Sequence, residues 1–201
     1  MRRLVLASGS ASRLSILRTA GFDPEVIVAD VNEDCAETDA GRIVDLLARR
    51  KAESVAASCG DALVIGCDSL LEIDNDALGK PDSIQTAHRN WQRLRNSRAT
   101  LVTGHCLIDT RTETSADEVV RTIVTFGSPT EAELATYLDT GESLRCAGGF
   151  TLEGIGAAFI ARVDGDALNV MGFSPPALRR LLLALGVSLE ELWPRGAASL
   201  R

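Results

Sequence analysis

The sequence is poor in the residues that build metal and redox centres. It has two histidines and five cysteines, and no two cysteines are spaced as Cys-x-x-Cys. A structural zinc site needs three or four nitrogen or sulfur ligands, usually in closely spaced pairs, so this class of site is excluded. We therefore interpret the cysteines as reduced and mostly buried small residues.

Long apolar runs and an excess of basic charge are also missing. No apolar segment approaches the length that spans a membrane, and the first apolar stretch is too short for a signal peptide. The chain carries 21 Lys and Arg against 28 Asp and Glu, a net charge of −7 that argues against a general nucleic-acid binder. We expect a cytoplasmic protein with neither a membrane nor a nucleic-acid partner.

What is present is enough to build one globular domain. The chain has 201 residues, 45% of them apolar, and strand and helix signals alternate along it. This alternation predicts a single α/β domain with a mixed sheet over residues 1–201. The expected strands are 3–7, 25–29, 61–73, 101–108, 119–126 and 157–163, the expected helices are 11–20, 41–58, 83–95, 129–141 and 175–186, and the tail 194–201 is expected to be irregular.

The end of the first expected strand carries the strongest functional signal. Ser8 and Ser10 follow the strand directly, and the next helix has Arg13 in its first turn. Helix starts attract anions because their first N–H groups lack partners and the helix dipole is positive there. Arginine can also bind two phosphate oxygens at once. The segment is typical of a phosphate site, although an ordinary helix cap with a solvated Arg13 would use the same residues.

Asp68 interrupts the apolar strand that contains Leu63 and Leu71. Burying a carboxylate is costly unless the group is paired, hydrogen-bonded or bound to a metal. Asp68 is therefore a candidate general base or ligand of a divalent cation. The alternative is a structural aspartate at a strand end, with Gly66 in a β-bulge.

Three further charged residues are candidates for the same site. Lys51 lies on the apolar stripe of helix 41–58, where it either has a task or extends its ammonium group into water. Lys80 lies between Gly79 and Pro81 on a stiff loop, a position that suits a phosphate contact. Glu33 belongs to an acidic loop, and the alternative to a role in the site is a solvated surface residue.

Seven segments, in order along the chain, carry a resemblance to a known family. They are Leu6-Ala7-Ser8-Gly9-Ser10 with Arg13, Ala48-Arg49-Arg50-Lys51-Ala52, Gly66-Cys67-Asp68-Ser69, Gly79-Lys80-Pro81, Thr103-Gly104, Ala147-Gly148-Gly149-Phe150 with Glu153-Gly154, and Asn169-Val170-Met171-Gly172. Together they resemble the Maf family of nucleoside triphosphate pyrophosphatases over nearly the whole chain. The resemblance implies an elongated mixed β-sheet with flanking helices and two lobes around a central cleft, as in inosine triphosphate pyrophosphatases.

The resemblance also implies a reaction and its participants. The reaction is cleavage between the α- and β-phosphates, with a divalent cation (Mg²⁺, Mn²⁺ or Co²⁺) and commonly in a homodimer, and the family's proton acceptor falls on Asp68. Phosphoryl transfer needs charge neutralisation and an oriented water, which these residue types can supply. Asp68, with Glu33, would hold the metal or take a proton from water. The triphosphate would be bound by Ser8, Ser10, Arg13, Lys51 and Lys80.

Three positions tune base choice in the family, and they correspond here to Ser12, Ser69 and Glu153. The sub-group that acts on dTTP and UTP has Arg, Thr and Gln there, and the sub-group that acts on 7-methyl-GTP has Trp, Gln and Glu. This chain matches neither set completely. Because a glutamate only accepts hydrogen bonds, Glu153 suits guanine- or cytosine-type or modified bases, whose edges are rich in donors. The small Ser12 and Ser69 predict broad tolerance.

Two other functions stay open at the level of the sequence. Maf-like proteins are also associated with inhibition of septum formation, so the chain could bind nucleotides and regulate cell division without significant turnover. A phosphatase would release orthophosphate in place of pyrophosphate. A buried acid favours catalysis over binding alone, because perturbed acids cluster at working sites.

Overall fold

The computed structural model describes residues 2–193, and the tail 194–201 lies outside them. Within this part of the chain, one seven-stranded sheet has the order β2-β1-β3-β5-β6-β7, with β4 paired to β3. β1, β2 and β3 run parallel, and the remaining pairs are antiparallel, so the expected mixed sheet is confirmed. The strands are β1 (Leu4–Leu6), β2 (Glu25–Val26), β3 (Leu63–Ile73), β4 (Asp76–Leu78), β5 (Arg98–Asp109), β6 (Thr114–Phe126) and β7 (Ile160–Asp164).

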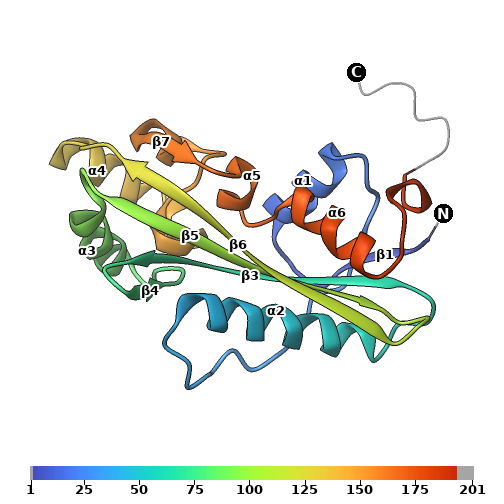
Figure 1. Ribbon diagram of the computed structural model, residues 1–201. Helices are drawn as coiled ribbons and strands as arrows, with labels where there is room; N and C mark the ends of the chain where they lie inside the picture. The colour runs from blue at the N-terminus through green and yellow to red at the C-terminus, as the bar shows by residue number, and fades with distance from the viewer. Residues whose placement is uncertain (1, 194–201) are drawn as a thin grey trace.

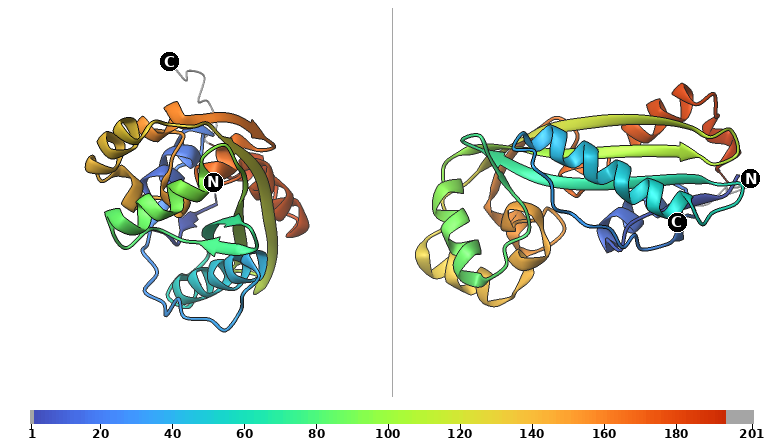
Figure 2. Two further views of the ribbon diagram at one scale, coloured as in Figure 1. Left: turned by 90° about the vertical axis from the view of Figure 1, so that its left-hand side faces the viewer. Right: turned by 90° about the horizontal axis from the view of Figure 1, so that it is seen from below.

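Helices flank this elongated sheet on both faces (Figures 1 and 2). The longest of them, α2, lies beneath the sheet in Figure 1, and α1 and α6 lie above it. α3 and α4 gather at the far end of the long strands. The helices are α1 (Ala11–Thr19), α2 (Ala40–Ala56), α3 (Ile84–Leu94), α4 (Glu131–Asp139), α5 (Ala167–Val170) and α6 (Pro175–Ala184), with short 3₁₀ turns at Glu142–Arg145, Ala147–Gly149, Ile155–Phe159 and Leu189–Glu191.

Two large hydrophobic cores occupy the two ends of the sheet. One packs α1 and α6 against β1 and the first half of β3, and includes Leu17, Ile65 and Leu182. The other packs α3 and α4 around Trp91 against the second half of β3 and the first half of β5. On β3, the half-buried stretch from Asp68 to Leu70 separates the two cores, at the position of the expected cleft.

Two glycines bring α2 unusually close to the sheet. A Cβ atom on Gly66 of β3 would lie 2.2 Å from the Ala48 carbonyl oxygen, and one on Gly104 of β5 would lie 2.2 Å from the Val44 carbonyl oxygen. Gly66 pairs in regular register with Cys106, so the alternative of a β-bulge at Gly66 is wrong. The glycines are there because the helix backbone needs the space of their missing side chains.

The edge of β3 is only partly covered by other strands. Within residues 2–193, β1 pairs with residues 63–65 of β3 and β4 pairs with residues 71–73, on the side away from β5. The stretch between them, which includes Asp68 and Ser69, has no strand on that side. Side chains of successive residues in a strand point to opposite faces of the sheet. The Asp68 and Ser69 side chains therefore lie on opposite faces, beside the edge of β3 that has no partner strand there.

Several predicted boundaries differ from the structure. The strand expected at 25–29 is only the two-residue strand β2, Glu25–Val26. The strand expected at 157–163 begins only at Ile160, because residues 155–159 form a 3₁₀ turn. The strand expected at 61–73 is followed by a turn and the short strand β4, which is not among the expected strands. The loop expected between the two central strands is mostly strand, since β5 extends to Asp109 and β6 begins at Thr114. Residues 110–118 are mostly polar because they are partly or fully exposed, so the pattern predicts a loop where the two strands continue.

The described helices include none that combines the length and apolar character of a transmembrane segment.

Candidate active site

The segment from Ser8 to Arg13 forms a strand, a turn and a helix start, as the sequence predicts. Ser10 is the N-cap of α1, and its hydroxyl accepts a hydrogen bond from the Arg13 backbone N–H. The Ser8 hydroxyl accepts from the Ser10 N–H at 3.3 Å and from Arg13 Nη1 at 3.0 Å. The capping interpretation is therefore correct for Ser10. It does not account for Arg13, whose side chain folds back over the turn.

Arg13 is a half-buried cation held by three neutral oxygens. Its Nε donates to the Gly172 carbonyl at 2.8 Å, Nη1 donates to Ser8, and Nη2 donates to the Ser69 hydroxyl at 3.1 Å. No carboxylate of residues 2–193 lies within ion-pair distance of it. A guanidinium has five N–H donors, so one N–H on each terminal nitrogen remains. Two such donors match two oxygens of a phosphate.

The Lys51 ammonium joins Asp68 and Glu33. Its Nζ lies 2.6 Å from Asp68 Oδ1 and 2.7 Å from Glu33 Oε1. The side chains of Lys51 and Asp68 are 12% and 14% exposed, whereas Glu33 is 62% exposed. Lys51 therefore does not simply extend into water, and Asp68 lies in the middle of β3. The α2 backbone reaches this position because Gly66, two residues before Asp68, admits it.

Arg50 anchors the loop that carries Glu33. Its Nη1 donates to the backbone carbonyls of Asn32 at 3.0 Å and Asp34 at 2.9 Å. These two bonds fix the backbone on both sides of Glu33 against α2. This role of Arg50 has no signal in the sequence, because the loop lies 16 or more residues away along the chain.

The charges of Arg13 and of the Lys51–Asp68 pair both affect the buried side chain of Cys67. Burial raises the pKa of its thiol to about 12; the positive charges of Arg13 and Lys51 oppose the shift, and the negative charge of Asp68 adds to it. All three charges therefore act on one buried sulfur atom. The thiol stays protonated near neutral pH and is not a nucleophile.

Two of the three predicted specificity residues lie together. The Ser12 hydroxyl of α1 donates a hydrogen bond to Glu153, which lies 141 residues further along the chain. The Glu153 loop is held by Glu142, whose carboxylate accepts from the N–H groups of Ile155 at 3.0 Å and Gly156 at 2.9 Å. Ser69, the third position, contacts Arg13 and the Thr103 hydroxyl instead.

Lys80 is a further predicted phosphate ligand, and the neighbouring Gly79 lies against Leu70 of β3. Among the described residues, the Lys80 side chain forms no hydrogen bond or ion pair with the other candidates. It is exposed on its loop, which is fixed by the Gly148 N–H donating to the Gly79 carbonyl at 3.0 Å. Its positive charge acts on Cys146, whose pKa is nevertheless raised, mainly by burial. Arg13, which binds Ser8 and Ser69, and Lys51, which binds Asp68, thus reach neighbouring residues of β3, and Lys80 lies on the loop after β4.

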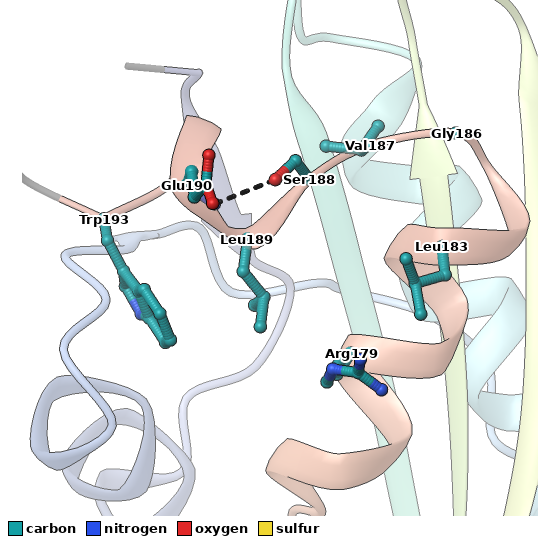
Figure 3. A pocket seen from close by; sticks show the side chains of 8 residues that line it. All are labelled: Arg179, Leu183, Gly186, Val187, Ser188, Leu189, Glu190 and Trp193. Carbon is teal, nitrogen blue, oxygen red and sulfur yellow. Dashed lines mark hydrogen bonds between the residues drawn. The ribbon is translucent and has the colours of Figure 1, made fainter.

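Two cavities lie outside this cluster. One, of about 450 Å³, lies where α6 ends and the chain continues towards Trp193 (Figure 3). It is lined by Arg179, Leu183, Gly186, Val187, Ser188, Leu189, Glu190 and Trp193. The other, of about 380 Å³, lies beside the Glu33 loop and includes Asn32 and Arg50 in its lining.

Within the described residues, no three His, Cys, Asp or Glu side chains form a ready metal cage. Glu33 and Asp68 nevertheless present carboxylate oxygens to one point, the Lys51 ammonium. Mg²⁺ is commonly bound by one or two carboxylates together with substrate phosphates, so this donor set fits such an ion when a phosphate is also bound.

The fold and this cluster define an α/β protein with a cationic site at the carboxyl end of a parallel strand. The chain belongs to the Maf-like protein family, whose profile matches residues 3–185. It is 50% identical over 196 residues to a nucleoside triphosphate pyrophosphatase of Streptomyces avermitilis, covering 96% of this chain and 95% of that protein. It is 43% identical over 210 residues to a protein of the same name from Mycolicibacterium gilvum, covering 97% and 100%.

The fold is also similar to that of a solved structure. The Staphylococcus aureus Ham1 protein matches with a TM-score of 0.50 and 16% identity, over 90% of this chain and 91% of that one. At this identity the likeness concerns the fold alone. It agrees with the expected sheet architecture.

Proposed function

We propose that this chain is a nucleoside triphosphate pyrophosphatase, which cleaves a nucleoside triphosphate into the monophosphate and pyrophosphate. Relatives of that name are 42–50% identical to it over nearly their full length. The observation that carries the proposal is that Arg13, a half-buried cation with no carboxylate partner among the described residues, and the Lys51–Asp68 ion pair reach the neighbouring β3 residues Ser69 and Asp68. A phosphate chain and an attacking water need these two environments side by side.

Each side chain has a stated task in this proposal. Arg13 and Ser8 bind phosphate oxygens, and Ser10 presents the start of α1 to the same group. Lys51 neutralises phosphate charge and holds two carboxylates next to each other without repulsion. Asp68 orients the water and takes its proton, because a carboxylate within hydrogen-bond reach of water can act as a general base. Lys80 approaches the phosphates from its loop.

A divalent cation, Mg²⁺, Mn²⁺ or Co²⁺, belongs to the proposal, with Glu33 and Asp68 as its protein ligands. When bound, it would neutralise charge on the phosphate oxygens. We also propose a homodimer, which light scattering of the purified protein would test, and a cytoplasmic location, where nucleoside triphosphates are abundant.

The test is a product assay on the purified protein. A panel of nucleoside triphosphates is incubated with each of the three cations, and pyrophosphate and orthophosphate are measured separately. Pyrophosphate release supports the proposal. Orthophosphate release would identify a phosphatase, and nucleotide binding without turnover would leave a regulatory role, such as in septum formation; either result would overturn the proposal.

Glu153 with Ser12 is proposed to read the base, and a donor-rich edge of the guanine or cytosine type is the best match. We expect Glu153→Gln to shift the ratio of kcat/KM for GTP over UTP towards UTP by about 10-fold, since one mismatched hydrogen bond is worth about 1–3 kcal/mol. Steady-state kinetics on both nucleotides checks this. Glu113→Gln, in the distant β5–β6 turn, is the matched control, and an unchanged ratio in Glu153→Gln would contradict the assignment. Ser69 as the third specificity position stays a prediction.

Arg13→Ala is expected to raise KM for the triphosphate by about 10- to 100-fold and to change kcat much less, because it removes binding energy for the phosphates. Arg18→Ala, exposed in the last turn of the same helix, should behave like the wild type. A loss confined to kcat would show that Arg13 acts in the transition state and would refute its role as a ground-state phosphate ligand.

A further inference from the structure

We propose that Thr103 is a positioning residue for Arg13, as the middle member of a one-way chain of hydrogen bonds that ends on the Asn169 carbonyl. The inference rests on the proposed function, in which Arg13 binds the phosphates. It gives a task to two sequence segments, Thr103-Gly104 and Asn169–Gly172, that the mechanism does not otherwise use.

The direction of the chain follows from the chemistry of its members. The Asn169 carbonyl oxygen can only accept, so the Thr103 hydroxyl donates to it, at 3.3 Å. A hydroxyl has one hydrogen, so the 3.0 Å contact between Thr103 and Ser69 requires Ser69 to donate. The Ser69 oxygen is then left as the acceptor for Arg13 Nη2 at 3.1 Å. Such aligned bonds polarise one another, and the cation at the start strengthens each of them.

The far end of the chain is rigid. Thr103 and Asn169 are fully buried. The Asn169 side-chain amide donates to the Leu101 carbonyl at 3.4 Å and to the Thr122 hydroxyl at 3.0 Å, which fixes α5 against β5 and β6. An anchor of this kind can hold the orientation of a guanidinium that is itself half exposed.

The segment from Asn169 to Gly172 also binds Arg13 directly. Gly172, three residues after Asn169, supplies the carbonyl that accepts from Arg13 Nε at 2.8 Å. Its φ of +97° is the left-handed conformation that favours glycine, and a Cβ atom there would lie 3.4 Å from Arg13 Nε. The segment continues to Ser174, whose N–H donates to His105 Nε2 at 3.0 Å. Burial lowers the pKa of His105 to about 4, so His105 stays a neutral acceptor.

The hydrogen bond to Gly172 and the chain through Ser69 and Thr103 together fix the plane of the Arg13 guanidinium. Nε and one hydrogen of each terminal nitrogen are occupied, so the two remaining hydrogens point in a direction set by Gly172 and by the Thr103 chain. Ser69 thereby acts on the phosphate site through Arg13, because its own hydrogen is already donated to Thr103.

The experiment compares three variants of the full chain. Thr103→Val keeps the shape and removes the hydroxyl, and Thr103→Ser restores it. Thr110→Val removes the hydroxyl of a threonine directly after β5, which bonds the Ala62 backbone and has no link to Asn169 or Arg13. We expect Thr103→Val to raise KM about 10-fold with kcat within about 2-fold of wild type, and Thr103→Ser to return KM to within about 2-fold. Thr110→Val should leave KM within about 2-fold even where it lowers Tm. An unchanged KM in Thr103→Val, or an equal rise in Thr110→Val, would overturn the proposal.

A second readout needs no turnover. NMR of the arginine Nη hydrogens in the free protein should show separate, slowly averaging signals for Arg13, assigned with Arg13→Lys, and these should merge in Thr103→Val but not in Thr103→Ser. If no nucleotide is hydrolysed and the signals behave this way, the proposed function fails and the positioning role stands. Should Thr103→Val not fold, Ser69→Ala carries the same test, and unmerged signals there would refute the chain.

Discussion

Replacing Asp68 with asparagine is expected to reduce pyrophosphate release by about 10³-fold while the protein stays folded, because general-base assistance is worth about 10²- to 10⁴-fold. Asparagine has the size of aspartate but cannot take a proton from water. Lys51 keeps Glu33 as a partner in the variant, so no buried cation is left unpaired. Initial rates over a range of enzyme concentrations, together with the far-UV circular dichroism spectrum, check both parts of this expectation.

Asp117→Asn is a closely matched control for this change. Asp117 is also a half-buried strand aspartate, and it forms an ion pair with Arg49 of α2 as Asp68 does with Lys51. It should retain near-normal turnover. A fully active Asp68→Asn variant would remove Asp68 from the mechanism, and equal losses in both variants would point to damaged packing of α2 in place of lost chemistry.

Gly66→Ala is expected to lower the free energy of unfolding by about 3 kcal/mol, because the added methyl group meets backbone that cannot move aside. The new Cβ would lie 2.2 Å from the Ala48 carbonyl oxygen and 2.7 Å from the Ala52 nitrogen. For a chain of this length, such a loss corresponds to a decrease in Tm of roughly 6–12 °C. Turnover should fall as well, since α2 must retreat and Lys51 moves away from Asp68. Thermal unfolding followed by calorimetry and initial rates measure the two effects.

Gly60→Ala gives the reference for this substitution, because no heavy atom lies within 4 Å of the Cβ that it would add. Gly104→Ala meets the Val44 backbone at the same distance as Gly66 meets Ala48 and should lose stability similarly. If the Gly66→Ala protein had the same Tm as the wild type, close backbone contact would not be what holds α2 on the sheet.

The parts of the site that are local in sequence could be predicted from it. The strand, turn and helix start around Ser8 and Ser10 follow from a short apolar run, capping residues and a helical pattern. Asp68 and Lys51 each stood out because a charge interrupts an apolar pattern. That they meet could not be derived, since it depends on how α2 is placed on the sheet.

The parts that depend on distant segments were not accessible from the pattern. The partners of Arg13 include Gly172, 159 residues away, and the acceptor there is a backbone carbonyl that carries no sequence signal. The sequence offers a β-bulge at Gly66 as one alternative, because a glycine in a strand has several possible causes, and only the position of α2 selects close packing. Glu142 holds the Glu153 loop by accepting hydrogen bonds from backbone N–H groups. The residues around Glu142 in the sequence form no pattern that predicts these bonds.

The uncovered stretch of β3 has a consequence for inhibitor chemistry. Of the five residues between the paired segments, 66–70, the last three are partly exposed. They span about 10 Å, which is too short to recruit a whole strand from another protein but long enough to pair with a peptide-like fragment. A compound that joins such a fragment to a phosphate mimic would draw part of its affinity from main-chain contacts. Mutations of charged side chains could weaken the hold on the mimic but would leave those main-chain contacts in place.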